Sequence, residues 1–339
     1  MGGGYGYTSM RWGMACDNLL EITMVTATGA VVTANATNNP ELLWAHQGGT
    51  GGNFGIVVAL KYRLYDLQPV WPIEVNWPIA DAAAVLTTWQ NQTTQTFSDT
   101  KLGILGFLAT KQRIETQADG EQVIYNDPYF CIRGIYSGED AESGKASLAP
   151  LLAIGSPTFP SGELWTKRIN YSDANEHLLD NVEGVIPDAA KESKRCAYVE
   201  RALTQADYQR IVDYFKRSPN LYNIVSMEPY GGAINARQPG DTAFVHRRAY
   251  FDIFVDSFWM QASERPQAFQ WLRNYFESAE MKDLWSGHYY QNYPNSEYTN
   301  WQEGYFGSNY PRLQEVKRQW DPLNFFTYEQ AIQLPKSLL

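Results

Sequence analysis

Hydrophobic and polar residues alternate in short runs over the first 65 positions of the chain. Apolar, β-prone runs predict strands over 19–25 and 30–34, joined by a turn at 28–29. A short helix is expected over 39–46, because its second residue is a proline and proline favours the first helical turn. A third strand is expected over 56–65. The opening segment therefore reads as a small, ordered set of strands with one helix.

From Pro69 to about residue 285 the pattern alternates between strand and helix. The most clearly marked helix opens with Thr204 as its N-cap and carries Asp207 three residues later, and its apolar positions form one face. Strands are predicted near 73–77, 101–109, 129–136, 222–228 and 248–256. Helices are predicted near 81–95, 140–153, 204–217 and 264–284.

Two further elements are predicted near the C-terminal end. The aromatic run 289–293 predicts a strand. A helix is expected over 305–319, and Asp321-Pro322 ends it, because the residue before a proline avoids the helical region.

Composition and charge exclude two classes of function. The 339 residues include 37 acidic and 27 basic side chains, so the formal net charge is −10, which argues against nucleic-acid binding. Hydrophobic residues make up 44% and charged residues 19%, which is typical of a globular chain. The longest apolar run, 56–60, is far too short to cross a bilayer. We expect no membrane partner.

Aromatic and cysteine content suggests less. The 22 Tyr, 15 Phe and 11 Trp fit either a well-packed core or a groove that stacks sugars and other flat ligands, and composition alone favours the core. The cysteines, Cys16, Cys131 and Cys196, form no zinc-type spacing with the four histidines. We therefore expect no metal site.

Two glycine clusters interrupt the N-terminal pattern. Neither stands in the strand–GxGxxG–helix order of a dinucleotide-binding fold, and neither contains GK[ST]. By spacing alone, tight turns are favoured over a cofactor loop. The clusters are Gly2, Gly3, Gly4 and Gly6, and then Gly48, Gly49, Gly51, Gly52 and Gly55.

Three motifs in order along the chain resemble those of berberine bridge enzyme-like FAD-linked oxidases. The first is the run GGGYGYTSMRWGMACDN…GGTGGNFGIVVALKYRL, the second is MEPYGGAIN…AFVHR, and the third is YYQNYPN…NWQEGYFGSNYPRLQEVKRQWDPLNFF. Together they cover nearly the whole chain, so the resemblance is specific. The same group includes glucooligosaccharide oxidases and plant alkaloid and cannabinoid oxidases.

The resemblance implies a division into domains and a fold class. An FAD-binding domain of the PCMH or vanillyl-alcohol-oxidase type would be formed by 1–70 and by 286–339, which returns to it. A substrate domain, an antiparallel sheet backed by helices, would be inserted at 71–285. With the alternating pattern in the middle, this predicts an α+β fold. The implied cofactor is FAD, and the implied partners are a small-molecule substrate and molecular oxygen.

The sequence departs from the family at the flavin attachment site. Members usually carry, ahead of GGGYG, a first phosphate loop whose histidine bonds covalently to the flavin, and then a cysteine that makes a second bond. Neither precedes Gly2 here, and Cys16 follows the glycine run, so it is no substitute. A truncated gene product or a late start would account for this. We therefore expect a truncated flavin domain that binds FAD weakly or not at all. No signal peptide is visible, although relatives are often secreted.

The resemblance also implies catalytic residues. Tyr293 matches the catalytic tyrosine of the family, which takes the hydroxyl proton while a hydride goes to the flavin. The reference pKa of a phenol is near ~10, so such a base needs assistance. Glu228, in the MEPYGG motif, matches an acidic position that supplies it, and the two motifs would meet in one cleft. The alternative is that Tyr293 is an ordinary member of an aromatic strand.

Cofactor-binding residues follow from the same matches. Tyr290 and Asn292 match positions that hydrogen-bond near the flavin, and on an ideal strand they share a face from which Tyr293 points away. Arg312 is expected to tie down the C-terminal helix, His246 to be structural, and His288 to be a candidate for the substrate pocket. The other cofactor-binding candidates are Gly3, Gly4 and Gly6 in the glycine run, and Gly55, Ile56 and Val57 at the adenine end.

Two functions from different classes remain after this reading. The first is an FAD-dependent oxidase that passes a hydride from a hydroxylated substrate, a sugar or a secondary metabolite, to flavin and then electrons to oxygen. The second is a catalytically inactive remnant or binding protein without flavin. A carbohydrate-binding module is a weaker third, since no repeat supports it. The motifs do not separate a sugar from a secondary metabolite.

Overall fold

The structure is a computed structural model that describes residues 1–94, 99–117, 119–180 and 186–335. The chain divides into two compact units. Unit 1 consists of Met1–Asp66, Gly232–Ala249 and Gly287–Leu339, and unit 2 consists of Leu67–Gly231 and Tyr250–Ser286. The hydrophobic pattern gave no sign that 232–249 groups with unit 1. No helix in the described part of the chain has the length and apolar character that crossing a membrane requires.

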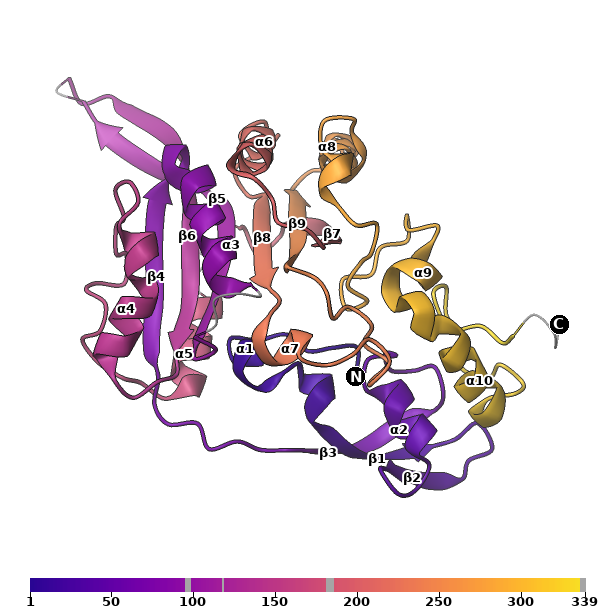
Figure 1. The fold of residues 1–339 in the computed structure, drawn as a ribbon. Helices are drawn as coiled ribbons and strands as arrows, with labels where there is room; N and C mark the ends of the chain where they lie inside the picture. Colours follow the sequence, from indigo (N-terminus) through magenta and orange to yellow (C-terminus); the bar gives the residue numbers. More distant parts are fainter. Residues whose placement is uncertain (95–98, 118, 181–185, 336–339) are drawn as a thin grey trace. The chain divides into compact units, whose positions relative to one another are not determined.

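Unit 1 contains a small antiparallel sheet in the order β2-β1-β3 (Figure 1). The three strands confirm the sequence prediction within a few residues. A core of apolar side chains joins β1 and α2 to the C-terminal helices, and includes Ile22, Leu42, Trp301 and Leu313. The elements are α1 (Ser9–Trp12), η1 (Ala15–Asn18), β1 (Leu19–Val25), β2 (Val31–Asn35), α2 (Pro40–His46), β3 (Ile56–Tyr62), α7 (Gly232–Asn235), α9 (Trp301–Phe306), η4 (Gly307–Asn309) and α10 (Tyr310–Trp320).

Unit 2 is built on an antiparallel sheet in the order β4-β6-β5-β8-β9-β7 (Figure 1). The fold is therefore α+β with antiparallel sheets, as predicted. Its strands are β4 (Trp71–Pro78), β5 (Leu102–Thr116), β6 (Gln122–Tyr136), β7 (Lys191–Val199), β8 (Ile224–Pro229) and β9 (Phe251–Trp259). Its helices are η2 (Ile79–Asp81), α3 (Ala82–Thr93), α4 (Ala141–Leu152), α5 (Tyr171–Asp180), α6 (Gln205–Phe215), α8 (Arg265–Glu277) and η3 (Lys282–Leu284).

The helices α3, α4, α6 and α8 cover one face of the sheet of unit 2. Alternate strand residues such as Val225, Met227, Ile253 and Val255 form a single apolar core with side chains of α3, α4, α6 and α8. The intervening residues of the same strands therefore point to the other face of the sheet. On β7, β8 and β9 those residues are largely polar, as described below.

Several sequence predictions require correction. No strand forms over 289–293, because the backbone turns there: the N–H of Tyr293 donates to the carbonyl of Tyr290 at 2.9 Å. The predicted helix 264–284 ends at Glu277 and is followed by the separate turn η3. The helix expected over 305–319 begins earlier, at Trp301, and is interrupted by η4. The predicted helix 81–95 corresponds to α3, and its last residue lies outside the described residues.

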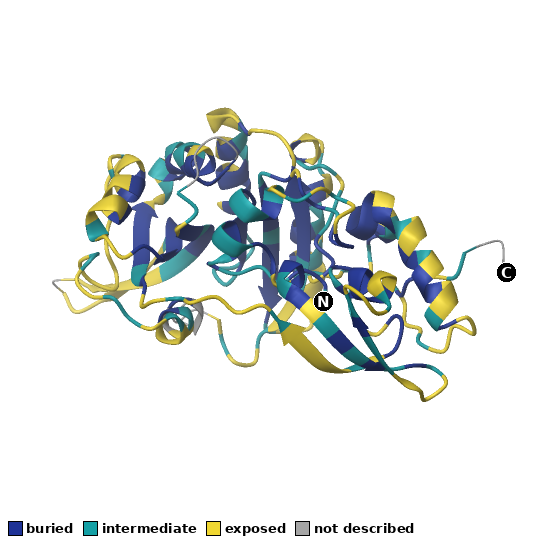
Figure 2. Cartoon of the chain, turned by 60° about the horizontal axis from the view of Figure 1, so that its bottom comes forward, coloured by how far each residue is buried: buried dark blue, intermediate teal, exposed yellow. Residues whose placement is uncertain are grey.

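Burial varies strongly between the two sheets. The strands of unit 2 are mostly buried, whereas β3 in unit 1 exposes Ile56, Val58 and Leu60 with relative accessibilities of 60%, 59% and 44%. Figure 2 shows exposed residues in yellow, and β3 is exposed along most of its length. The strand is at the edge of its sheet, so its outer backbone groups are not paired within the described sheet.

Candidate functional site

The first glycine run lies directly against the side chains of the YQNY segment in unit 1. The N–H of Gly4 donates to the hydroxyl of Tyr290 at 2.7 Å. A Cβ on Gly3 would lie 2.6 Å from that hydroxyl oxygen, and a Cβ on Gly2 would lie 2.0 Å from Oδ1 of Asn292. Gly3 and Gly4 also have φ of +150° and +87°, which side chains disfavour. Gly3 is therefore required by space as well as by conformation, whereas the exposed side chain of Asn292 can move away from a Cβ on Gly2.

The other side of the glycine run is held by η1. The carbonyls of Gly3 and Gly4 accept hydrogen bonds from the N–H groups of Cys16 and Ala15 at 2.8 and 2.9 Å. Cys16 is fully buried, and burial followed by the charge of Asp17 raises the pKa of its thiol to about 12. The thiol therefore stays protonated at neutral pH and is a poor nucleophile.

Tyr290, Asn292 and Tyr293 come together even though no strand forms. Nδ2 of Asn292 donates to the hydroxyl of Tyr290 at 2.9 Å. The rings of Tyr290 and Tyr293 meet edge to face, with centroids 5.0 Å apart and an angle of 86° between their planes. Tyr290 is buried, Tyr293 is half-buried and Asn292 is exposed. The turn replaces the strand geometry that would have separated Tyr293 from the other two.

The second glycine cluster joins this segment through one residue. Nε2 of Gln291 donates to the carbonyl of Gly48 at 2.7 Å, and the N–H of Gly48 donates to the carbonyl of Met1 at 2.8 Å. Gly55 immediately precedes β3, and Ile56 and Val57 are the first residues of that strand and pair with β1. A Cβ on Gly55 would meet the sulfur of Met24 at 2.5 Å, so the described contacts of this stretch are structural.

The remaining sequence candidates in unit 1 have mainly structural contacts. Arg312 binds both carboxylate oxygens of Glu41 at 2.7 Å and lies 3.8 Å above the ring of Trp44, so it ties α10 to α2 as expected. Nε2 of His246 lies 3.0 Å from the carbonyl of Tyr305. Burial, and then the neighbouring His288, lower the pKa of His246 to about 3, so His246 is neutral.

In unit 2, Glu228 lies on β8 and pairs across the strands with Asp252 on β9. Asp252 is completely buried, and within the described residues neither of its carboxylate oxygens has a hydrogen-bond partner. Burial, and then the charge of Glu228, raise the pKa of Asp252 well above its ordinary value. Burial and the neighbouring carboxyl therefore both favour the protonated form of Asp252. Tyr198 on β7 pairs with Asp252 across the strands, and its hydroxyl lies 3.2 Å from the hydroxyl of Tyr230.

Two more charged residues share this face. Nζ of Lys194 on β7 lies 2.8 Å from Oδ1 of Asp256 on β9. Burial raises the pKa of Asp256 to about 7, although Lys194 opposes the shift. Sequence reasoning missed Asp252, Asp256 and Lys194. The available signal was the spacing of the two aspartates in FDIFVDSFW, which places both on one face of a strand.

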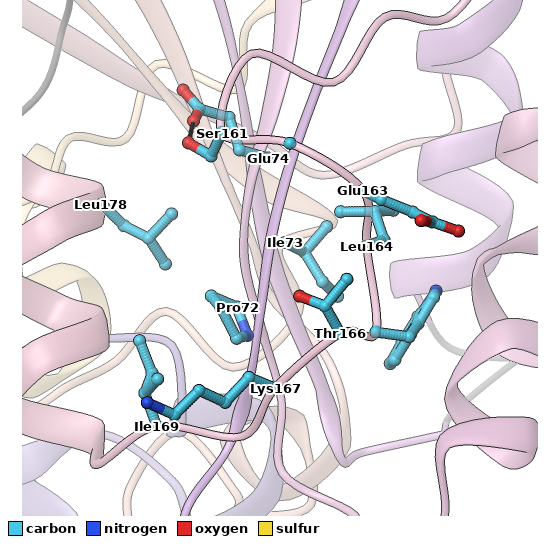
Figure 3. A pocket seen from close by; sticks show the side chains of 12 residues that line it. Pro72, Ile73, Glu74, Ser161, Glu163, Leu164, Thr166, Lys167, Ile169 and Leu178 are labelled. Carbon is cyan, nitrogen blue, oxygen red and sulfur yellow. Dashed lines mark hydrogen bonds between the residues drawn. The ribbon is translucent and has the colours of Figure 1, made fainter.

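Each unit also contains a hollow. In unit 2 a hollow of about 260 Å³ lies beside β4, lined by residues that include Ile73, Leu164, Lys167 and Leu178 (Figure 3). Glu74 on its wall is paired with buried Arg133 at 2.6 Å and also bonds Ser161, so its charge is compensated. In unit 1 a hollow of about 300 Å³ borders the glycine run, lined by Gly4, Tyr5, Gly6, Thr8, Ser9, Trp12, Gly13, Ala15, Asn18, Tyr62, Arg63 and Tyr65.

Comparison with known proteins decides the family. The model of the berberine and berberine-like family matches residues 289–333. The FAD-linked oxidoreductase YgaK of Bacillus subtilis is 30% identical over 336 residues, a match that covers 98% of this chain and 68% of that protein. The chain belongs to the berberine bridge enzyme-like family of FAD-linked oxidoreductases.

Other members of the berberine bridge enzyme-like family match over the same extent. The chitooligosaccharide oxidase of Gibberella zeae is 27% identical, and the match covers 99% of this chain and 66% of that protein. Among solved structures, wild-type BBE-like 1 of Physcomitrella patens shares the fold with a TM-score of 0.79, 24% identity, and coverage of 98% and 69%. The chain thus spans about two thirds of the length of these relatives.

Proposed function

We propose that this chain carries the substrate-oxidising machinery of an FAD-linked oxidase that converts a hydroxylated small molecule, a sugar or a secondary metabolite, to its carbonyl product with reduction of oxygen to hydrogen peroxide. The proposal rests on a set of contacts in unit 1: the N–H of Gly4 and Nδ2 of Asn292 both donate to the hydroxyl of Tyr290, and the ring of Tyr290 packs against that of Tyr293. Relatives named as chitooligosaccharide and xylooligosaccharide oxidases support a carbohydrate as the first substrate to test.

The residues present fit the reactive end of a flavin. Asn292 is exposed and carries both a donor and an acceptor, and Tyr293 is half-buried beside it. Bound FAD would accept a hydride from the substrate and return the two electrons to oxygen. We propose that Tyr290 and Asn292 orient the ring, with Tyr290 itself held by the N–H of Gly4. Because Cys16 is buried and its thiol stays protonated, we propose that it forms no bond to the cofactor.

Tyr293 is the proposed proton acceptor. When the C–H bond of the substrate breaks, its hydroxyl proton must leave, and a phenolate accepts a proton readily once it has formed. The hydrogen bond from the N–H of Tyr293 to the carbonyl of Tyr290 and the edge-to-face ring contact hold Tyr293 in one orientation. Such preorganisation is what a general base requires.

The carboxyls of unit 2 have a separate proposed role. We propose that Glu228 is the ionised carboxylate that favours removal of the tyrosine proton, and that Asp252 is its protonated neighbour. The strand pairing of Glu228 with Asp252 and the raised pKa of Asp252 support this division, since two adjacent buried carboxyls seldom ionise together.

Because we expect weak FAD binding, the proposal is tested with the purified protein in excess FAD, mixed with chitooligosaccharides, xylooligosaccharides and a panel of phenolic alcohols. Bleaching of the flavin band under nitrogen, followed by peroxide formation on admission of air, is the expected result with at least one class. Acid precipitation should leave the flavin in the supernatant, because Cys16 forms no bond. A flavin-loaded protein that no hydroxylated compound reduces would contradict the proposal.

A further inference from the structure

The face of β7, β9 and β8 opposite the apolar core carries a ladder of ionisable groups. Lys194 pairs with Asp256 across the strands, and Glu228 pairs with Asp252. Phe254 lies between the two aspartates on the same face, and Nζ of Lys194 is 4.7 Å from the centre of its ring. We call Glu228, Asp252, Asp256 and Lys194 the acid ladder. The opposite face of these strands belongs to the apolar core.

The three carboxyls of the acid ladder are buried, and they outnumber the one ammonium group of the ladder. Asp252 is 0% exposed, and Glu228 and Asp256 are each 8% exposed, while the side chain of Lys194 is 28% exposed. The ladder itself contains three carboxyls and one ammonium group, and that ammonium group also lies 3.8 Å from Glu192. Asp252 has no hydrogen-bond partner within the described residues. Burying three carboxylates beside one cation is unfavourable, so at least one carboxyl keeps its proton at neutral pH.

Lys194 is the cation that faces all of these acids. Burial opposes its charge, but Asp256, then Glu192 and Glu228, raise the pKa of Lys194 overall. Its positive charge in turn opposes the upward pKa shifts of both Asp252 and Asp256. On this face of the described strands the ionisable groups are Glu192, Lys194, Cys196 and Tyr198 from β7, Asp252 and Asp256 from β9, and Glu228 from β8.

We propose that Lys194 is a positioning residue that decides which carboxyl of the acid ladder is ionised: paired with Asp256, it favours the carboxylate form of Glu228 and leaves the proton on Asp252. This inference rests on the proposed function in one respect, namely that Glu228 assists proton removal in the reaction. Lys194 itself touches no reacting atom in this account. It acts through the charge that it places beside the carboxyls.

Replacing either partner of the Lys194–Asp256 ion pair should shift the pKa values of the remaining carboxyls, and the two replacements should shift them in opposite directions. Lys194→Met removes the positive charge and its contact with the Phe254 ring but keeps most of the length of the side chain, so the carboxyl pKa values should rise. Asp256→Asn removes a negative charge and frees Lys194 for the other acids, so the pKa values of Glu228 and Asp252 should fall. Each shift should be about one pH unit, the lower end for a nearby charge. Lys194→Arg should behave like the parent.

The direct readout is the infrared C=O band of protonated carboxyls, followed against pH in the flavin-free protein. Asp252→Asn identifies the contribution of Asp252 by removing its part of the band. We expect the deprotonation midpoint to move up in Lys194→Met and down in Asp256→Asn. Midpoints that stay fixed, or that move in the same direction in both variants, would overturn the inference. A purely structural role for Lys194 predicts no such opposite pair.

The second readout is the acid limb of the pH profile for flavin reduction by substrate in the FAD-loaded protein. It should shift in the same two directions, by about one unit, with Lys194→Arg unchanged. Opposite infrared shifts with an unmoved rate profile would uphold the role of Lys194 in ionisation and contradict the proposed part of Glu228 in the reaction. Failure of the inference and failure of the proposed function are thus distinguishable. Thermal melts of each variant at the pH used confirm that folded protein is compared.

Discussion

At the scale of single residues, space around the glycine run is as restrictive as backbone conformation. Gly4 has a φ of +87°, and a Cβ there would lie 2.6 Å from the Cβ of Ala15. Gly29 has nearly the same φ, +83°, but a Cβ there would meet nothing within 4 Å. An alanine at either position would therefore carry the strain of a positive φ, but only an alanine at Gly4 would also clash with a neighbouring residue.

Gly4→Ala should consequently cost more stability than Gly29→Ala. Both carry the penalty of a left-handed backbone for alanine, about 1–2 kcal/mol. Gly4→Ala adds an overpacking cost of about 1–3 kcal/mol because Ala15 and η1 must shift. Urea denaturation of the two variants beside the parent measures the difference. Equal losses of unfolding free energy would show that the contact with Ala15 is soft.

Loss of the Tyr290 hydroxyl should also destabilise unit 1. The hydroxyl of Tyr290 accepts hydrogen bonds from the N–H of Gly4 and from Nδ2 of Asn292. Tyr290→Phe leaves the partly buried N–H of Gly4 without this partner, so we expect a loss of about 1 kcal/mol, near the lower end of the range of about 1–3 kcal/mol that an unsatisfied buried donor costs. Tyr328→Phe is the control, since Tyr328 is 47% exposed. Denaturation midpoints should fall for the first variant and stay unchanged for the second.

At the scale of elements, α10 shows how a buried ion pair differs from an exposed one. Nζ of Lys317 lies 2.7 Å from Oδ2 of Asp321 and 2.7 Å from the carbonyl of Asn53, and both charged side chains are fully buried. The next residue, Arg318, pairs with Glu315 at 2.7 Å, but both are more than half exposed. The buried pair joins the helix end to the second glycine cluster, whereas the exposed pair stays within one helix.

Lys317→Met should therefore destabilise the protein by about 3–5 kcal/mol, because Asp321 would remain as an uncompensated buried charge. Arg318→Met should cost at most about 0.5 kcal/mol. Burial opposes the charge of Asp321, but the hydrogen bonds from Lys317 and from two backbone N–H groups hold the pKa of Asp321 below its ordinary value.

The depressed pKa of Asp321 gives its contribution a definite pH dependence. The stabilisation is complete above the unfolded pKa of about 3.9 and is lost as the pH falls through the lower folded value. Denaturation of the parent and of Lys317→Met from pH 6 to pH 3 tests this. The difference between them should shrink as the pH falls, and a difference independent of pH would contradict the assignment.

Strands and helices could be predicted from the sequence where alternation, turns and capping residues were clear. They were missed where charged residues interrupted the apolar pattern. The strands β1 to β3 and the capped helix α6 followed from alternation, turns and the Thr204 cap. Strand β7 was missed because charged residues such as Lys194 and Arg195 interrupt its apolar pattern, and their partners come from distant parts of the chain. Asp252 and Asp256 were missed for the same reason, since their environment is created by neighbouring strands. The turn at Tyr290 is set by contacts with Gly4, 286 residues away.

At the scale of the whole molecule, unit 1 is assembled from three separate stretches of the chain. Its core combines β1 and α2 with side chains of the last stretch, including Tyr298, Trp301, Phe306, Leu313 and Ile332. Unit 2 has its own core, formed without any residue of that stretch. The two cores should therefore differ in their dependence on the C-terminal residues.

A chain ending at Ser286 should keep the sheet of unit 2 and lose the order of β1, β2 and β3. Removal of the last stretch takes away seven of the seventeen buried apolar residues of the core of unit 1, whereas the core of unit 2 is intact. Hydrogen exchange followed by mass spectrometry reports protection for each strand. Equal protection of β1 in the full and shortened chains would contradict this view of unit 1.

The role of Tyr293 as the proton acceptor is tested by anaerobic stopped-flow reduction of the FAD-loaded protein by its substrate. Tyr293→Phe removes the hydroxyl and keeps the ring that packs on Tyr290. Flavin reduction should slow by about 10²-fold or more, the scale expected for loss of acid–base assistance. Reoxidation by oxygen and the rates of the control Tyr328→Phe should remain near those of the parent. Reduction of the flavin in Tyr293→Phe at the parental rate would contradict the role of Tyr293 as the proton acceptor.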